Sequence, residues 1–177
     1  MLPIILRYGL IAALIVGGAL FSISLAFNGV PPMSYGMALG YLTMLIALSA
    51  VFVGIKRYRD RDHGGVIRFW PAFGMGLGIS LIAALGYVLA WEAALAVIDI
   101  DFPETFANAM IERQKAKGVD AAALAKLTAD MARFKIQYAN PLYRLPMTFA
   151  EIFPVGVLVS LVSAALLRNS RFLPARG

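Results

Sequence analysis

The chain has 177 residues, of which 60% are hydrophobic and only 15% are charged, with a mean hydropathy of +0.77. Soluble domains carry about 25% charged residues, so this composition excludes a soluble protein and indicates an integral membrane protein. The absence of cysteine and the single histidine exclude disulfides, cysteine nucleophiles and multi-histidine metal sites, so we expect no metal and no cofactor. Basic residues at the ends of spans explain the net charge of +6, and we expect no nucleic-acid partner.

Four apolar stretches are each long enough to cross a bilayer, which takes about 20 helical residues. They cover residues 5–27, 35–55, 70–98 and 145–167. These stretches are too long and unbroken for the alternating strands of a barrel. The sequence therefore predicts an all-α fold, a four-helix transmembrane bundle in which residues 1–177 form one membrane domain. The first stretch exceeds the apolar core of a signal peptide, about 7–15 residues, so we expect it to be retained.

The connections between the first three spans differ sharply in charge. A tight, uncharged turn with two prolines is expected at 28–34, whereas the stretch 56–69 contains five of the sixteen basic residues. We interpret the stretch 56–69 as a short polar loop whose cations are candidate contacts for anionic lipid head groups. The alternative is a topology signal with internal salt bridges. The five cations are Lys56, Arg57, Arg59, Arg61 and Arg68.

The distribution of lysine and arginine predicts how the protein is oriented. Basic residues concentrate in the stretch 56–69 and in the C-terminal tail, and the turn between the first two spans has none. Because cytoplasmic loops are enriched in lysine and arginine, both termini and the stretch 56–69 are expected to be cytoplasmic. The segment 99–144, whose charges nearly balance, is then expected on the outer side.

The segment between spans 3 and 4 has the pattern of a helical hairpin over about residues 102–140. Pro103 precedes a first amphipathic helix, Gly118 is its expected stop, and Asp120 is a candidate N-cap for a second helix that ends near Tyr138. One interpretation is a hairpin packed on itself and on the membrane surface. The other is a docking face for a partner protein or for a second copy in a homo-oligomer.

Two carboxylates lie in or near the apolar spans, where charges are costly and often functional. Trp70 and Trp91 are separated by about 31 Å of helix, so Glu92 is expected at the outer interface, most simply facing water. Glu151 is expected about 5 Å below that interface. Either it has a structural role, in a capping box with Thr148 or in another pairing, or it binds a cation, a proton or a hydrogen-bond donor.

These carboxylates belong to a candidate outward-facing polar pocket. Arg144 is expected to pair with one of them, and two tyrosines are close in sequence. The candidate residues are Tyr87, Glu92, Tyr143, Arg144 and Glu151. Nothing in the sequence specifies a nucleophile, so no catalytic residue is assigned.

Two glycine pairs have the spacing that allows helices to pack closely, Gly36-x-x-x-Gly40 and Gly74-x-x-x-Gly78. Packing within the bundle is the expected role, and homodimerisation is the alternative.

Two blocks of residues carry a resemblance to a known family. The first block runs from Gly54 to Asp62 and continues with Gly64-Gly65, Phe69, Ala72-Phe73, Gly76, Tyr87-Val and Trp91-Glu92. The second comprises Asn140-Pro-Leu-Tyr-Arg144, Thr148, Glu151 and Pro154-Val-Gly156. In order and spacing the chain resembles a family of bacterial inner-membrane proteins catalogued as domain of unknown function 4199. The resemblance implies four spans in a bacterial inner membrane, and no activity, cofactor or catalytic residue.

The leading functional hypothesis is non-enzymatic binding of a partner protein or a membrane lipid. One alternative is a small transporter or channel component that uses the outer-side carboxylates. A second alternative is a membrane-embedded enzyme with an outward-facing site.

Overall fold

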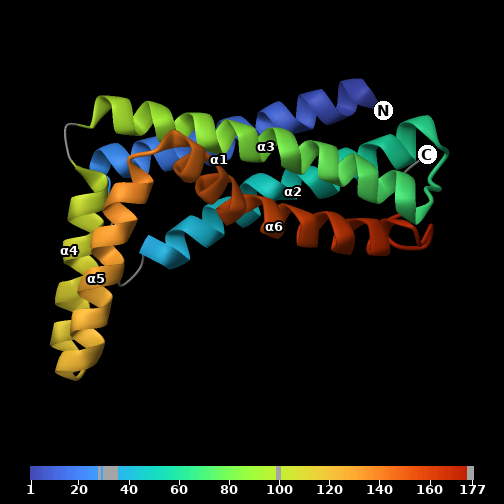
Figure 1. The fold of residues 1–177 in the computed structure, drawn as a ribbon. Helices are drawn as coiled ribbons and strands as arrows, with labels where there is room; N and C mark the ends of the chain where they lie inside the picture. Colours follow the sequence, from blue (N-terminus) through green and yellow to red (C-terminus); the bar gives the residue numbers. More distant parts are fainter. Residues whose placement is uncertain (28, 30–35, 99–100, 175–177) are drawn as a thin grey trace.

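The structure is a computed structural model that describes residues 1–27, 29, 36–98 and 101–174, and these residues form six α-helices and no strand. The helices are α1 (Leu2–Ala26), α2 (Gly36–Asp62), α3 (Phe69–Val97), α4 (Phe102–Ala116), α5 (Ala121–Tyr138) and α6 (Pro141–Leu167). Helices α1, α2, α3 and α6 form a bundle, and each is long and apolar enough to cross a membrane. The predicted four-helix bundle with an additional helical hairpin is confirmed (Figure 1). The predicted turn at 28–34 lies outside the described residues, apart from Gly29.

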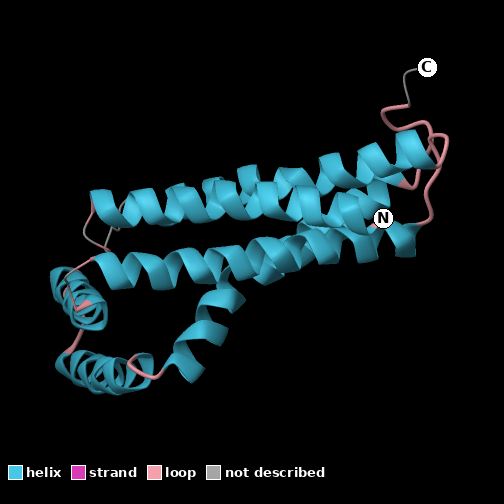
Figure 2. Ribbon diagram, turned by 90° about the horizontal axis from the view of Figure 1, so that it is seen from above, coloured by secondary structure: helices cyan, strands magenta, loops and turns pink. Residues whose placement is uncertain are grey.

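The two ends of the bundle differ in what they carry. Met1, the α2–α3 connection and residues 168–174 lie at one end, which we call the basic end (Figure 1). Helices α4 and α5 lie at the other end, which we call the hairpin end. Figure 2 shows the bundle from above, with the two hairpin helices seen almost along their axes. The hairpin therefore lies across the direction of the membrane-spanning helices.

Helix α3 is the centre of the bundle and packs against α1, α2 and α6. Small residues let α3 and α6 approach closely, because a Cβ added to Gly76 would lie 2.7 Å from the Cβ of Ser160. The Ser80 hydroxyl lies 3.1 Å from the Ser160 hydroxyl and donates to the Gly156 carbonyl at 3.2 Å. Close approach of the two backbones and hydrogen bonds of the serine hydroxyls thus hold the α3–α6 interface together.

The glycine pairs singled out by spacing are not where the helices approach most closely. A Cβ added to Gly40 or Gly74 would meet no neighbouring atom within 4 Å. Only Gly78 of the second pair faces a partner, the side chain of Ile5. The expectation of close packing is therefore wrong for Gly40 and Gly74. Spacing shows that two glycines share a face, but not which face meets a neighbour.

The basic stretch is mainly helical, which corrects the expectation of a loop over 56–69. Helix α2 continues to Asp62, and only residues 63–68 connect it to α3. Lysine and arginine are good helix formers, Lys56 pairs with Asp60 four residues later, and basic residues suit a helix C-terminus. The helix stops where Gly64 and Gly65 adopt positive φ angles of 57° and 86°.

Arg59 differs from the other four cations of this stretch because it is fully buried. Its guanidinium donates to the carbonyls of Phe172 at 2.9 Å and Leu173 at 2.5 Å, and its Nε donates to Asp60 at 2.6 Å. It therefore fastens α2 to the segment that follows α6 and does not face lipid head groups. Arg61 and Arg68 are exposed, whereas Lys56 and Arg57 are half-buried.

Helix α6 starts earlier than the predicted residue 145. Asn140 caps its N-terminus by accepting from the Leu142 amide at 3.0 Å, and Pro141 occupies the first turn, where a missing N–H costs nothing. The stretch 140–146 therefore forms the start of α6, after α5 has ended at Tyr138. Pro146 and Pro154 lie inside the helix, and Figure 1 shows its first half inclined to its second half.

The hairpin is built from local signals. Asp120 caps α5 by accepting from the Ala123 amide at 2.8 Å. Gly118 lies just after the end of α4 and has a positive φ angle of 70°, as is common for a glycine that ends a helix. Both expectations are confirmed. Lys135 of α5 pairs with Glu104 of α4, and its ammonium lowers the pKa of Glu104 below the usual value.

Candidate functional site

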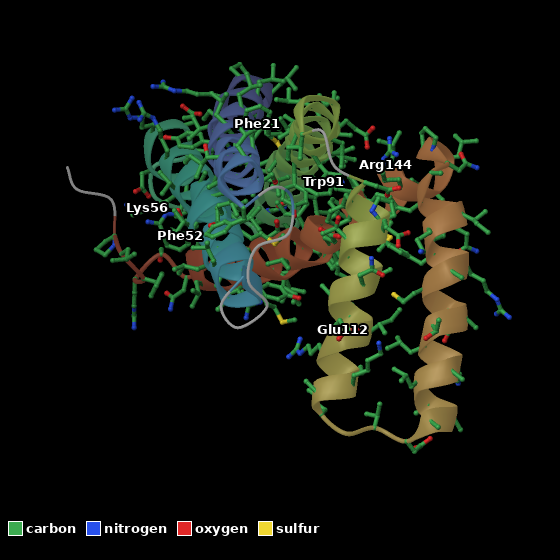
Figure 3. All side chains as sticks on the ribbon, turned by 90° about the vertical axis from the view of Figure 1, so that its left-hand side faces the viewer. Phe21, Phe52, Lys56, Trp91, Glu112 and Arg144 are labelled. Atoms are coloured by element: carbon green, nitrogen blue, oxygen red, sulfur yellow. The ribbon has the colours of Figure 1, made fainter. Side chains whose placement is uncertain are left out.

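An aromatic cluster joins the hairpin to the bundle. The cluster consists of Trp91 of α3, Phe102 and Phe106 of α4, and Phe134 and Tyr138 of α5. Neighbouring rings lie at centroid distances of 4.8 to 5.8 Å, which is the range of favourable aromatic pairs. Figure 3 shows Trp91 where the bundle meets the hairpin, and Glu112 farther along α4. The cluster fixes the base of the hairpin against the end of α3.

Tyr138 is the polar centre of this cluster. The Trp91 indole donates to the Tyr138 hydroxyl at 2.6 Å, and only 4% of the Tyr138 surface is exposed. Burial disfavours the tyrosinate and raises the pKa of Tyr138 to about 12. Tyr138 therefore stays neutral at physiological pH and acts as a hydrogen-bonding wall residue.

A cavity of about 450 Å³ lies beside the cluster at the hairpin end. Every one of the six described helices contributes to its wall, which is mainly apolar and aromatic. The lining residues are Leu20, Ile23, Ser24, Gly29, Gly36, Met37, Tyr87, Trp91, Phe102, Phe106, Met110, Arg113, Phe134, Tyr138, Met147, Thr148 and Glu151. Small-molecule sites typically enclose about 300–1,000 Å³ and combine an apolar wall with a few polar groups, and this cavity has both properties.

Glu151 is the carboxylate of the cavity wall, and Tyr87 is its partner. The Tyr87 hydroxyl donates to Glu151 Oε2 at 3.1 Å. The capping-box interpretation of Glu151 is wrong, because α6 starts ten residues earlier and the Thr148 hydroxyl donates to the Arg144 carbonyl at 3.0 Å. Glu151 therefore lies within the helix and presents its carboxylate to the cavity.

Arg144 and Glu92 form a second polar pair. Arg144 binds Glu92 through two parallel bonds, Nε to Oε1 at 2.7 Å and Nη2 to Oε2 at 2.5 Å, which confirms that Arg144 pairs with one carboxylate. Its Nη1 also donates to the Tyr138 carbonyl at 3.3 Å. The pair connects α3, α5 and α6, and Figure 3 shows Arg144 near the junction of bundle and hairpin.

The five residues of the predicted polar pocket thus occupy three places. Tyr87 and Glu151 line the cavity together, while Glu92 and Arg144 form the separate pair beside it. Tyr143 is 41% exposed and is not among the described residues of the cavity wall. The aromatic wall was not identified as a site from the sequence, although the shared face of Phe102 and Phe106 was its visible signal.

The Arg144–Glu92 pair is expected to stabilise the attachment of α6 to α3. Replacing Arg144 with methionine should lower the free energy of unfolding by about 1.5–3 kcal/mol, because hydrogen bonds to charged groups are lost. Thermal unfolding in detergent of Arg144→Met, Glu92→Gln and the double variant measures the coupling. Purely additive effects of the two changes would contradict the pairing.

A smaller cavity of about 170 Å³ adjoins the larger one between α1 and α2. Its wall consists of Val16, Leu20, Ile23, Gly36, Gly40, Thr43, Met44 and Tyr87. Four of these residues also line the larger cavity, so the two spaces share a boundary. No group of three or more histidine, cysteine or acidic side chains suited to a metal occurs within the described ranges.

Comparison with known proteins places the chain in one family. The family model described as "Protein of unknown function (DUF4199)" matches residues 7–169. This range runs from α1 to beyond the end of α6 and includes the complete walls of both cavities. No curated protein and no solved structure matches the chain.

Proposed function

Because this chain belongs to the DUF4199 family, whose description states no activity, we propose its function from geometry: it binds a single lipid, without catalysis, in the cavity at the hairpin end. The cavity lies among the ends of membrane-spanning helices, where lipid is the surrounding solvent. Its wall offers apolar and aromatic surface to the hydrocarbon chain of a lipid and a carboxylate to the head group. A lipid combines these two chemistries in one molecule.

The observation that carries the proposal is Glu151 as the carboxylate of a mainly apolar and aromatic wall, in which Ser24, Arg113 and Thr148 are further polar residues. A carboxylate in a membrane-spanning helix is costly, and such residues usually have a functional partner. An ionised carboxylate accepts about four hydrogen bonds, and Tyr87 supplies one of them. Within the part of the chain that the structure describes, Glu151 has no basic partner. The remaining capacity suits an ammonium head group, which would complete the charge pair.

Trp91 provides an internal reporter for this binding. It lines the cavity but is only 7% exposed, which shields it from the chains of the bulk lipid. Trp70, the second tryptophan of the chain, is 75% exposed at the basic end and can be removed as Trp70→Phe. In this background, phosphatidylethanolamine with brominated chains is titrated into phosphatidylglycerol nanodiscs that hold the protein. Binding in the cavity is expected to quench Trp91 fluorescence in a saturable manner.

Replacing Glu151 with glutamine should weaken the binding of phosphatidylethanolamine about tenfold. The variant keeps the shape of the side chain but loses a charge-assisted bond worth about 1.5–3 kcal/mol. Glu112→Gln is the matched control, because Glu112 is exposed on α4, outside the described cavity wall, and forms a local ion pair with Lys115. Quenching that never saturates, or that is equal in Glu151→Gln and the control, would reject the proposal.

Transport is the second candidate, and the position of Glu151 in α6 three residues before Pro154 favours it. An ion-coupled transporter needs a titratable group at a helix that can bend, and this helix has both features. Flux into proteoliposomes that Glu151→Gln abolishes would support transport over simple binding. The enzyme alternative has less support, because Glu92 is bound to Arg144 and does not join Glu151 as a second free carboxylate for acid–base work.

Two further surfaces suit the partners expected from the sequence. Arg61 and Arg68 at the basic end are exposed and suit anionic lipid head groups in the adjoining leaflet. Docking of a partner protein or of a second copy on the hairpin, and the inner-membrane orientation with cytoplasmic termini, stay predictions from the sequence pattern.

A further inference from the structure

The smaller cavity continues the larger one toward the interior of the bundle. It shares Leu20, Ile23, Gly36 and Tyr87 with the larger cavity, and Gly40, Thr43 and Met44 line its remaining part along α2. The eight helical steps from Gly36 to Met44 correspond to about 12 Å along a helix axis. The smaller cavity therefore runs from the hairpin end into the membrane-spanning part of the protein.

The wall of the smaller cavity is suited to a hydrocarbon chain. Its side chains are apolar except for Tyr87 and Thr43, and the Thr43 hydroxyl is already used, because it donates to the Leu39 carbonyl of its own helix at 2.8 Å. Protein interiors are close-packed, and a space of about 170 Å³ is large for an unfilled void. In a membrane, the available material that matches this wall is a lipid chain.

Gly40 keeps this space open. A Cβ at this position would meet no neighbouring atom within 4 Å, so Gly40 is not required for helix packing. A glycine inside a helix is nevertheless destabilising relative to alanine. The absence of a side chain on Gly36 and Gly40 leaves a shallow channel on the α2 face that borders the cavity. Binding of an acyl chain explains Gly40, which helix packing does not.

We propose that the smaller cavity holds one acyl chain of the bound lipid, with an ammonium head group at Glu151. This inference rests on the proposed lipid binding and adds the location of the chain and the class of head group. The acyl chain lies between α1 and α2, over Gly40 and toward Met44. The aromatic cluster lines the larger cavity, where the head group lies.

Photolabelling tests where the acyl chain lies. A phosphatidylethanolamine with a diazirine at the end of one chain is irradiated with the protein in nanodiscs, and labelled residues are identified by mass spectrometry. We expect labelling of Val16, Thr43 and Met44 that an excess of unlabelled phosphatidylethanolamine suppresses. An equal excess of phosphatidylglycerol, which has no ammonium group, should suppress it much less.

Gly40→Leu tests the channel, because it places a side chain in a space where its Cβ meets no neighbouring atom within 4 Å. Labelling at Val16 and Met44 should fall about tenfold, which corresponds to an overpacking cost near 1.4 kcal/mol. Gly18→Leu is the matched control, since Gly18 also has no neighbouring atom within 4 Å and lies outside both cavity walls. Thr43→Met, which fills the same space from another position, should reproduce the loss.

The outcomes separate this inference from the proposed function. Saturable quenching of Trp91 together with unchanged labelling in Gly40→Leu and Thr43→Met would overturn the chain location and leave lipid binding intact. Equal suppression by phosphatidylglycerol and phosphatidylethanolamine would overturn the ammonium head group. Absence of both saturable quenching and suppressible labelling would reject the lipid-binding function itself.

Discussion

Replacing Arg59 with alanine should lower the free energy of unfolding by about 3–5 kcal/mol, the cost of removing one partner from a buried charged network. The guanidinium of Arg59 is fully buried and binds the carbonyls of Phe172 and Leu173. Without it, these carbonyls lose their donors, and Asp60 loses one of its two basic partners. A cavity also replaces the largest fully buried side chain of the protein's described part.

Thermal unfolding in detergent measures this effect, and trypsin digestion shows where it acts. The segment after α6 is held by Arg59 and by packing of Phe172 against Phe52. Loss of the Arg59 side chain should therefore speed cleavage after Arg168 and Arg171. Arg61→Ala is the matched control, because Arg61 lies on the same helix but is exposed, and its effect should stay within about 0.5 kcal/mol. Equal stability of the two variants would contradict the structural role of Arg59.

Replacing Gly86 with leucine should destabilise the bundle by about 3 kcal/mol, at the upper end of typical overpacking costs. A Cβ at Gly86 would collide with the Cβ of Ala13 and lie 3.2 Å from its Cα, so α1 must move away from α3. On the facing helix, a Cβ at Gly17 would lie 3.3 Å from the Gly86 carbonyl oxygen. The backbones therefore touch at this crossing, and no side-chain rotation can relieve the clash.

Gly74→Leu is the control for this crossing, because it makes the same change on the same helix where no neighbouring atom lies within 4 Å. It should leave the unfolding free energy within about 0.5 kcal/mol of the wild type. Unfolding in mixed detergent, followed by tryptophan fluorescence, compares the two variants. A Gly86→Leu protein as stable as Gly74→Leu would show that α1 and α3 are not in backbone contact.

Features that depend on residues close to one another in the sequence were predictable from the sequence. Hydrophobic length determines which segments span the membrane, because every buried backbone group must be paired within a helix. The caps of the hairpin are equally local, since Asp120 acts on the amide of Ala123 three residues later. Boundaries were less accurate: the basic residues after Ile55 looked like a loop, but they continue α2 because their charges pair along the helix.

The partners of the ionisable groups needed the tertiary structure. Arg144 was expected to pair with one of two carboxylates, and the structure assigns it to Glu92, 52 residues away in sequence. Glu151 instead receives its bond from Tyr87, 64 residues away. Spacing along one helix does not determine such pairs, because the rotation of α6 relative to α3 depends on packing at Gly76, Ser80 and Ser160.

The sequence by itself determined the membrane class, the four spans, the hairpin and the separation of a basic end from a hairpin end, because these follow from local hydropathy, capping and charge. Only the tertiary structure decided that the six described helices line one cavity with Glu151 in its wall. It also decided that Gly86 meets a neighbouring helix while Gly40 borders an open space. Identical residues have different roles here because helix rotation determines what each one faces.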